Sequence, residues 1–198
     1  FVVLRGDLPT SHAKSLMQWS HASDLVSFIR QEWGEQLHLS VAAYPEAHPE
    51  SENIKICTQL FLAKMHAGAD DAITQYFYNA ESYRRLLERC RSGGMLKPII
   101  PGVMPLDNYA GIKRFSERCG ADIPRWLEKE MCAYANDEQG AFEVGVEIVS
   151  ALCMRLLDLG APSLHFYTLN RSRAVMAILQ QLQQHGYLPL DSAHASVM

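Results

Sequence analysis

The sequence predicts an α/β protein whose strands form a parallel (β/α)8 TIM barrel, here without about its first three βα units. Short apolar runs alternate along the 198 residues with longer runs of helical period, which is typical of βα units around a parallel sheet. Polar residues cluster directly after the strand-like runs, and a parallel barrel keeps its active site at the carboxyl ends of its strands. The chain also opens on Phe1, inside an apolar strand, so we expect it to be the later part of a larger barrel.

Five runs predict strands because they are continuously apolar or alternate with period two. In chain order they are FVVL at residues 1–4, LHLSVAA at 37–43, AITQYF at 72–77, PIIPG at 98–102 and SLHFYT at 163–168. Five strands cannot close an eight-stranded barrel, whose usual size is roughly 250 residues. Without the other units, barrel-interior residues such as Val41, Ile73 and Ile100 would lie exposed along unpaired edges, so we expect self-association.

Seven segments have the apolar period of helices. They span residues 22–33, 52–68, 80–92, 109–119, 124–135, 138–160 and 171–185. Glycine at or just after a helix end is a common stop signal. Four glycines stand at such positions: Gly68, Gly94, Gly120 and Gly160. We expect residues 1–185 to be the C-terminal part of one barrel domain and residues 186–198 to be a flexible tail.

An open, doubly wound sheet is the alternative to a barrel. That fold binds its ligand through a glycine-rich phosphate loop after the first strand. Neither GxGxxG nor GxxxxGK[ST] occurs in the sequence, so the barrel is favoured.

The composition excludes several classes of function. The net charge is −4, the pI is near 6.1, and the basic residues are scattered among carboxylates, so the sequence offers no basic field for nucleic acid. No apolar run approaches the roughly 20 residues that cross a bilayer, so no membrane partner is expected. The five cysteines show no CxxC spacing, which indicates reduced core residues of a cytoplasmic protein.

The first polar cluster is Arg5-Gly6-Asp7, where a cation, a flexible glycine and a carboxylate leave a strand together. Such a triplet could hold an anionic ligand beside a hydrogen-bond donor. A surface loop with a solvated ion pair explains the same residues. In the second cluster, the rings of Tyr44 and His48 could flank a planar cofactor, although a lone histidine in such a loop is more often merely exposed. No metal site is expected, because no second ligand stands at metal-binding spacing.

Gln75 is the stronger candidate, because a neutral amide inside an apolar strand is costly to bury without partners. An amide that faces a barrel interior could read the donor and acceptor edge of a heterocycle. The alternative is an amide that neighbouring backbone satisfies. Phe115, on a later helix, is better explained as a core residue when taken alone, but it could also cover a ligand.

Six segments, in this order and spacing, resemble the catalytic barrel of the methylenetetrahydrofolate reductases. They are LRGDLP, SVAAYPEAHPES, AGADDAITQYFY, IIPGVMPL, IPRWL and LHFYTLNR. The resemblance implies reduction of 5,10-methylenetetrahydrofolate to 5-methyltetrahydrofolate in one-carbon metabolism and methionine biosynthesis. Hydride would pass from NADH or NADPH to FAD and then to the folate. The full-length form would be a homo-oligomer.

The resemblance also implies roles for individual residues. Asp7 would hydrogen-bond the pterin and tune the flavin, and Gln75 would contact folate and nicotinamide in turn. These two are the catalytic candidates. Phe115 would stack against either substrate, and Arg171 would help hold the folate. The positions that would contact FAD are Arg5, Gly6, Ala22, Tyr44, His48, Ser51 and Lys64.

Several positions depart from the family pattern. Cys57, Leu60 and Ala63 stand where the family commonly has polar FAD contacts, and Gly111 replaces a polar substrate contact. The family's general acid, a glutamate on its first strand, would lie before Phe1, so we expect the 198 residues alone to be inactive. A non-catalytic relative or truncated product that binds folate or a protein partner without turnover is the alternative. A flavin-free barrel aldolase ranks low, because no predicted strand ends in a lysine for Schiff-base chemistry.

Overall fold

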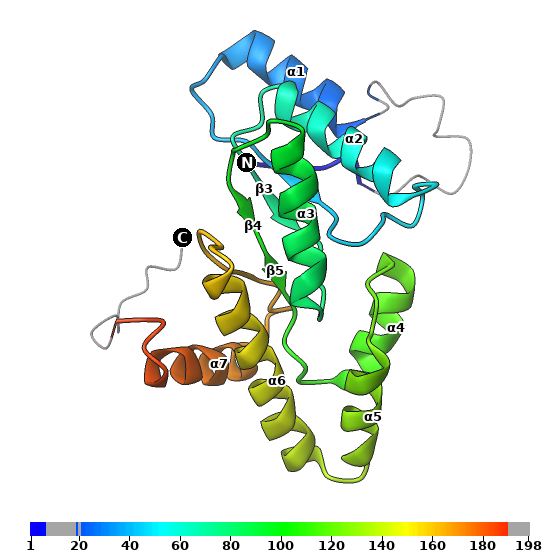
Figure 1. Ribbon diagram of the computed structural model, residues 1–198, viewed down its shortest axis with the longest axis vertical. Helices are drawn as coiled ribbons and strands as arrows, with labels where there is room; N and C mark the ends of the chain where they lie inside the picture. The colour runs from blue at the N-terminus through cyan, green and yellow to red at the C-terminus, as the bar shows by residue number, and fades with distance from the viewer. Residues whose placement is uncertain (7–18, 20, 190–198) are drawn as a thin grey trace.

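The structure is a computed structural model that describes residues 1–6, 19 and 21–189. Asp7 and residues 190–198 of the expected tail lie outside the described residues. Within them, the chain alternates between short strands and longer helices (Figure 1). The α/β class predicted from the sequence is confirmed.

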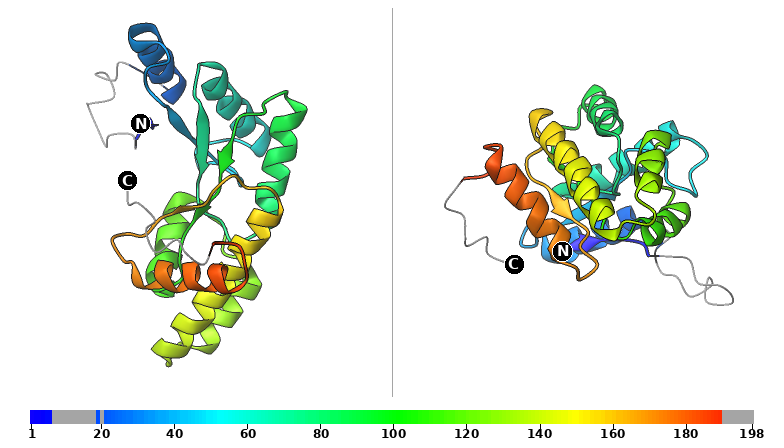
Figure 2. Two further views of the ribbon diagram at one scale, coloured as in Figure 1. Left: turned by 90° about the vertical axis from the view of Figure 1, so that its left-hand side faces the viewer. Right: turned by 90° about the horizontal axis from the view of Figure 1, so that it is seen from below.

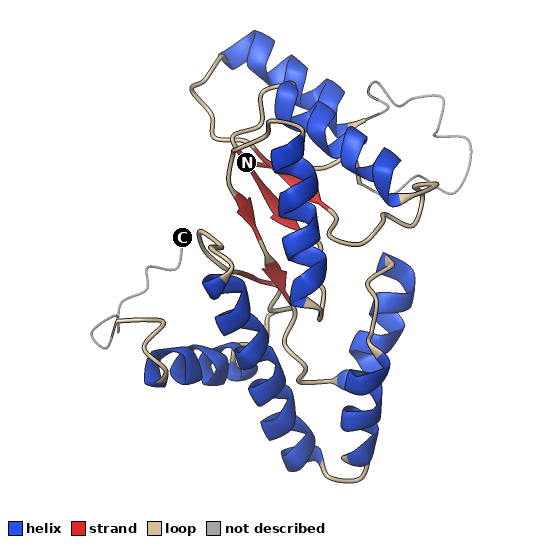
Figure 3. Cartoon of the chain, in the orientation of Figure 1, coloured by secondary structure: helices blue, strands red, loops and turns tan. Residues whose placement is uncertain are grey.

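All strand pairs in the described chain are parallel. One sheet has the order β1-β2-β3-β4, with β1 at Val2–Val3, β2 at Ser40–Ala43, β3 at Asp71–Thr74 and β4 at Ile99–Ile100. A second pair joins β5 at Gly102–Val103 to β6 at His165–Phe166. Figure 3 shows the strands, in red, close to one another and beside the helix at Ala80–Ser92. Strand neighbours follow one another along the chain, as they do in a barrel.

The predicted strand at residues 98–102 is two short strands. Pro101 separates β4 from β5, and proline has no N–H to donate to a sheet ladder. Its carbonyl still accepts a hydrogen bond from the His165 N–H at 3.0 Å. Pro101 therefore lies between the two sheets, and its carbonyl still contributes a hydrogen-bond acceptor to the pairing of β5 with β6.

The two faces of the first sheet differ in burial. Val3, Val41, Ala72 and Ile99 are in register across the four strands, and each is at most 4% exposed. Residues on the opposite face are more exposed to solvent, and Val2 is 55% exposed. The expectation that Val41 lies exposed on the barrel interior is wrong, because its side chain is fully buried in the core with helix residues such as Val26 and Phe61. Ile73 and Ile100, named with it, lie on the opposite face and are half-buried.

In the residues that the structure describes, seven helices pack around the strands. They are α1 at Ala22–Trp33, α2 at Ile54–His66, α3 at Ala80–Ser92, α4 at Tyr109–Cys119, α5 at Arg125–Ala133, α6 at Glu138–Asp158 and α7 at Arg173–Gln184. Helix α1 packs beside α2, α2 beside α3, α3 beside α6, and α6 beside α7 (Figures 1 and 2). This sequential order is that of the helical layer around a barrel. The predicted bounds of α1, α3 and α4 match at both ends.

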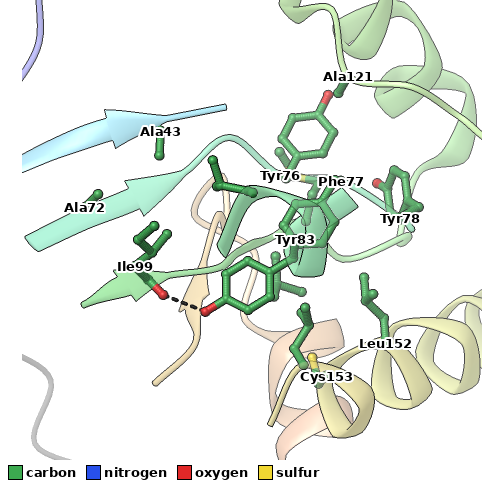
Figure 4. Close-up of a cluster of buried hydrophobic side chains, with 14 of the residues drawn as sticks. Ala43, Ala72, Tyr76, Phe77, Tyr78, Tyr83, Ile99, Ala121, Leu152 and Cys153 are labelled. Atoms are coloured by element: carbon green, nitrogen blue, oxygen red, sulfur yellow. Dashed lines mark hydrogen bonds between the residues drawn. The ribbon is translucent and has the colours of Figure 1, made fainter. Parts of the chain in front are cut away.

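An aromatic core lies where β3 leads into α3. The rings of Phe77 and Tyr83 stack with centroids 6.1 Å apart, and the Tyr83 hydroxyl donates to the Ile99 carbonyl at 2.7 Å (Figure 4). Cys153 of α6 packs into the same cluster. Strand β3 was expected to run to Phe77 but ends at Thr74, because the residues that follow leave the sheet to fill this core.

Beyond α7, Tyr187 and Leu188 still pack against the core, and the Tyr187 hydroxyl donates to Asp158 Oδ1 at 2.9 Å. Residues just past the expected domain boundary at 185 therefore contact the folded body. In the part of the chain that the structure describes, no helix is both long enough and apolar enough to span a membrane.

Candidate functional site

A cavity of about 410 Å³ lies at the carboxyl ends of β1 and β2, beside α1 and α2. Its apolar wall includes Val3, Leu4, Ala42 and Phe61. All seven residues that the sequence suggested as FAD contacts line this one cavity: Arg5, Gly6, Ala22, Tyr44, His48, Ser51 and Lys64. They come from four separate segments, which the parallel arrangement of β1 and β2 brings together.

Arg5 enters the cavity from the end of β1. Gly6 follows it with φ +75°, a conformation that favours glycine. The Arg5 guanidinium donates from Nη2 to Glu50 Oε2 at 2.6 Å, so the loop after β1 is joined to the loop after β2. Arg5 therefore forms an ion pair with Glu50. An ion pair within the Arg5-Gly6-Asp7 triplet, the alternative that the sequence left open, would involve Asp7, which lies outside the described residues. Arg5 and Glu50 both line the cavity, so their pair forms part of its rim.

Tyr44 and His48 form one edge of the cavity. Their ring centroids are 4.7 Å apart with an interplanar angle of 87°, so the rings meet edge to face. The His48 Nδ1 accepts a hydrogen bond from the Glu50 N–H at 3.0 Å. Burial is the main cause that raises the pKa of the Tyr44 hydroxyl, which keeps that group neutral at physiological pH. Tyr44 therefore gives this edge of the cavity an uncharged aromatic surface.

Lys64 reaches into the cavity from α2. Its ammonium donates to the Ala42 carbonyl and lies 5.9 Å from the centroid of the Tyr44 ring. Burial lowers the pKa of Lys64 to about 8. The amine therefore carries a charge at neutral pH that is lost in the mildly alkaline range.

The rest of the α2 wall is apolar. Cys57 is 6% exposed and Leu60 is 47% exposed, and both line the cavity beside Phe61. Ala63 is exposed and does not line it. Among the α2 residues that line the cavity, Lys64 is thus the one that brings a charge.

Gln75 lies just beyond the end of β3. Its N–H donates to the Ala43 carbonyl at 2.8 Å, which holds it beside the end of β2. Its side-chain Oε1 accepts from the Tyr76 N–H at 3.0 Å, so neighbouring backbone satisfies the amide oxygen. No hydrogen bond joins its Nε2 to another described residue. The Gln75 Nε2 can therefore donate to a ligand, whereas the Oε1 already accepts one hydrogen bond from backbone.

Thr74, which the sequence reasoning missed, fixes the backbone next to Gln75. Its hydroxyl oxygen accepts from the Gly102 N–H at 2.8 Å, and its carbonyl accepts from the Tyr167 hydroxyl at 2.9 Å. A Cβ at Gly102 would lie 2.2 Å from that carbonyl oxygen, so the close approach requires glycine. The ends of β3, β5 and β6 therefore meet at Thr74. The signal for Thr74 in the sequence was its residue type, a polar threonine within an apolar strand.

Phe115 and Arg171 lie outside the cavity. The Phe115 ring on α4 stacks with Tyr76, with centroids 6.0 Å apart and 14° between the planes. This contact agrees with the core interpretation of Phe115, and Tyr76 links it to Gln75. The Arg171 Nη1 lies 3.6 Å from Asp107 Oδ2, and the Arg171 side chain remains exposed. Gly111, near the start of α4, donates its N–H to Asn108.

The described residues contain no group of three or more histidine, cysteine, aspartate or glutamate side chains placed to hold a metal ion. The site is therefore described by its cations, its aromatic edge and its apolar wall.

Comparison with known proteins finds a family. The family model for methylenetetrahydrofolate reductase matches residues 1–183. A 5,10-methylenetetrahydrofolate reductase of Escherichia coli is 38% identical over 181 residues, which cover 91% of this chain and 60% of that protein. A Caenorhabditis elegans protein named "Probable methylenetetrahydrofolate reductase (NADPH)" is 36% identical over 182 residues and is covered over 28% of its length. The chain therefore spans less than two thirds of these relatives.

A solved structure shares the fold. It is described as an uncharacterized protein from Clostridium thermocellum that binds two copies of 5-methyl-5,6,7,8-tetrahydrofolic acid. The TM-score is 0.57 at 22% sequence identity, and the match covers 84% of this chain and 59% of that one.

Proposed function

This chain belongs to the methylenetetrahydrofolate reductase family, and from that premise we propose that it forms part of an enzyme that reduces 5,10-methylenetetrahydrofolate to 5-methyltetrahydrofolate. The proposed cofactor is FAD, with NADH or NADPH as the hydride donor. One observation carries the proposal. Seven residues suggested as FAD contacts, spread along the chain from Arg5 to Lys64, line a single cavity.

The cavity fits part of a flavin dinucleotide. Its volume of about 410 Å³ lies in the range of small-molecule sites. Arg5 and Lys64 can neutralise phosphate charge, while Tyr44 and the apolar wall can cover a flat ring. Glu50 opposes this charge because it pairs with Arg5 at 2.6 Å. We propose that this ion pair opens when an anion enters, which releases the guanidinium for the ligand.

When bound, FAD supplies the hydride chemistry, and the protein supplies orientation and electrostatics. Gln75 would donate from its Nε2 to a substrate heterocycle, because its Oε1 is already bonded to Tyr76. Phe115 would have to present the ring face that does not stack on Tyr76. The role of Asp7 stays a prediction, because that residue lies outside the described ones.

The folate substrate class has independent support. The Clostridium thermocellum protein that shares this fold binds 5-methyltetrahydrofolate, the expected product of the reaction. By analogy, we place the folate at the strand ends near Gln75 and assign Arg171 to its outer part. The buried thiols of Cys90 and Cys153, whose pKa values burial raises to about 11 and about 12, are compatible with a cytoplasmic protein. Homo-oligomerisation of the full-length form stays a prediction.

Anaerobic absorbance spectroscopy tests the proposal. The purified chain, alone and within its full-length parent, is loaded with FAD, reduced with NADH or NADPH, and then given methylenetetrahydrofolate. The proposal expects the flavin absorbance to bleach on reduction and to return with folate in the parent, with on the order of one flavin per chain. A full-length protein that stays colourless would instead support the alternative, a relative that binds without turnover. The expected inactivity of the 198 residues alone is measured in the same experiment.

The alternative has its own observation. Cys57 and Leu60 give the α2 side of the cavity an apolar surface where the family commonly has polar FAD contacts. A ligand held there would gain fewer hydrogen bonds. Folate binding that persists without measurable flavin uptake would favour the alternative.

A further inference from the structure

We propose that Glu46 is a positioning residue that fixes the cavity-lining loop against the connection between α4 and α5, so that the cavity and the helix that carries Phe115 keep one relative position. This inference rests on the proposed function, because it assigns the cavity to the cofactor and Phe115 to the substrate. It concerns residues 44–51, which form most of the connection between β2 and α2.

The loop has two functional sides. Tyr44, His48, Glu50 and Ser51 line the cavity, whereas Pro45, Glu46 and Pro49 do not. The second set is held from outside the cavity. The Pro45 carbonyl accepts from Arg89 Nη2 at 3.2 Å, which ties the loop to α3.

Glu46 makes two hydrogen bonds to distant segments of the chain. Its Oε2 accepts from the Asp122 N–H at 2.9 Å, and its Oε1 accepts from the Ser82 hydroxyl at 3.3 Å. These partners are 76 and 36 residues away along the chain. One carboxylate thus joins the loop after β2 to the start of α3 and to the connection after α4.

Packing at the end of α4 reinforces the same contact. Gly120 ends this helix with φ +70°, and a Cβ there would lie 2.6 Å from Pro49 Cγ. Helix α4 also carries Phe115, whose ring stacks on Tyr76 one residue after Gln75. The Glu46 contacts therefore connect the cavity-lining loop to the segment that follows the helix carrying Phe115.

Glu46 is partly buried, and burial is the main cause that raises the pKa of its carboxyl group. Glu46 does not line the cavity, so a ligand there would not contact its carboxylate. Its two hydrogen bonds position other elements, which is the role we assign to it.

Amide hydrogen exchange of the purified chain tests the inference, with Glu46→Ala, Glu46→Gln and the control Glu52→Ala. Glu52 is exposed in the same loop region. Without ligand, Glu46→Ala should speed exchange at the Asp122 N–H by about tenfold and leave α7 amides such as that of Ile178 within about twofold. Glu46→Gln, which keeps one acceptor oxygen, should recover most of the protection, and Glu52→Ala should match wild type.

The second arm adds FAD. In the wild type, FAD should slow exchange at the Asp122 N–H although Asp122 does not line the cavity. Glu46→Ala should abolish this slowing and weaken FAD binding by about tenfold. An Asp122 amide that exchanges equally in wild type and Glu46→Ala, or faster exchange throughout the chain, would overturn the inference. If wild type binds no FAD, the proposed function fails, while the ligand-free arm still decides the role of Glu46.

Discussion

The Lys64 ammonium, on α2, donates a hydrogen bond to the carbonyl of Ala42, in strand β2. This contact holds the amine at the end of the strand and directs its charge toward the cavity that both residues line. Because the amine is largely desolvated, its pKa is lowered to about 8.

Anion binding in the cavity should depend on pH through Lys64. The charged amine predominates below a pH of about 8, so FAD affinity should be constant there and fall by up to about tenfold per pH unit above it. Lys64→Met should bind FAD more weakly at pH 7 and lose the dependence. Fluorescence titration between pH 6.5 and pH 9.5 measures both. Lys55→Met, on the exposed side of the same helix, should behave as wild type.

Stability should show the opposite trend with pH. The pKa of Lys64 is lowered in the folded state, so between about pH 8 and pH 10.5 the unfolded state binds more protons. The contribution of Lys64 to the free energy of unfolding is therefore unfavourable below pH 8 and becomes less so as pH rises through that window, by at most about 3 kcal/mol. Urea unfolding of wild type and Lys64→Met at pH 7 and pH 9.5 tests this. A gap between the two proteins that does not change with pH would contradict the prediction.

Thr74→Val should destabilise the chain. The substitution leaves the Gly102 N–H buried without its acceptor at 2.8 Å, and such a loss costs about 1–3 kcal/mol. Thr168→Val makes the same chemical change at an exposed position and should alter the free energy of unfolding by less than about 0.5 kcal/mol. Urea unfolding compares the two variants. Equal effects would show that Thr74 does not join β3 to β5 in the way described.

Leu60→Asn should strengthen FAD binding. Leu60 lines the cavity and is 47% exposed, so an amide there gains hydrogen-bonding capacity at little cost in packing. One added hydrogen bond predicts an affinity increase of about threefold to tenfold. Ala63→Asn is the matched control on the same helix, because Ala63 does not line the cavity. An equal gain from both variants would contradict the position of the cavity.

Much of the fold was predictable because the signals are local. Helix ends at Gly120 and Gly160 and the alternation of strands with helices depend on neighbouring residues. The face of Val41 was predicted wrongly, because both faces of a parallel strand are apolar and periodicity cannot separate them. The run PIIPG was predicted as one strand because it is apolar. Pro101 divides it into β4 and β5, because proline has no N–H to donate to a sheet ladder.

For the candidate site, the sequence indicated residues that line the cavity but not the contacts that position them. Arg5, Gly6, Tyr44 and His48 follow strand ends, where parallel strands converge, so their sequence context drew attention to them. Ala22 and Lys64 lie on helices α1 and α2, and the family resemblance indicated them instead. The contacts of Glu46 and Thr74 were missed, because their partners lie far along the chain. The hydrogen bond that the Gln75 amide oxygen accepts from Tyr76 depends on the side-chain rotamer, which no sequence pattern encodes.

The most direct test of the central claim is a flavin titration of the purified chain at pH 7, followed by fluorescence quenching, for wild type and Tyr44→Ala. Tyr44 contributes the aromatic edge of the cavity. The cavity assignment predicts saturable binding with a stoichiometry of about one FAD per chain and a loss of affinity of about tenfold in Tyr44→Ala. The absence of saturable binding by the wild type, or equal binding by both proteins, would contradict it.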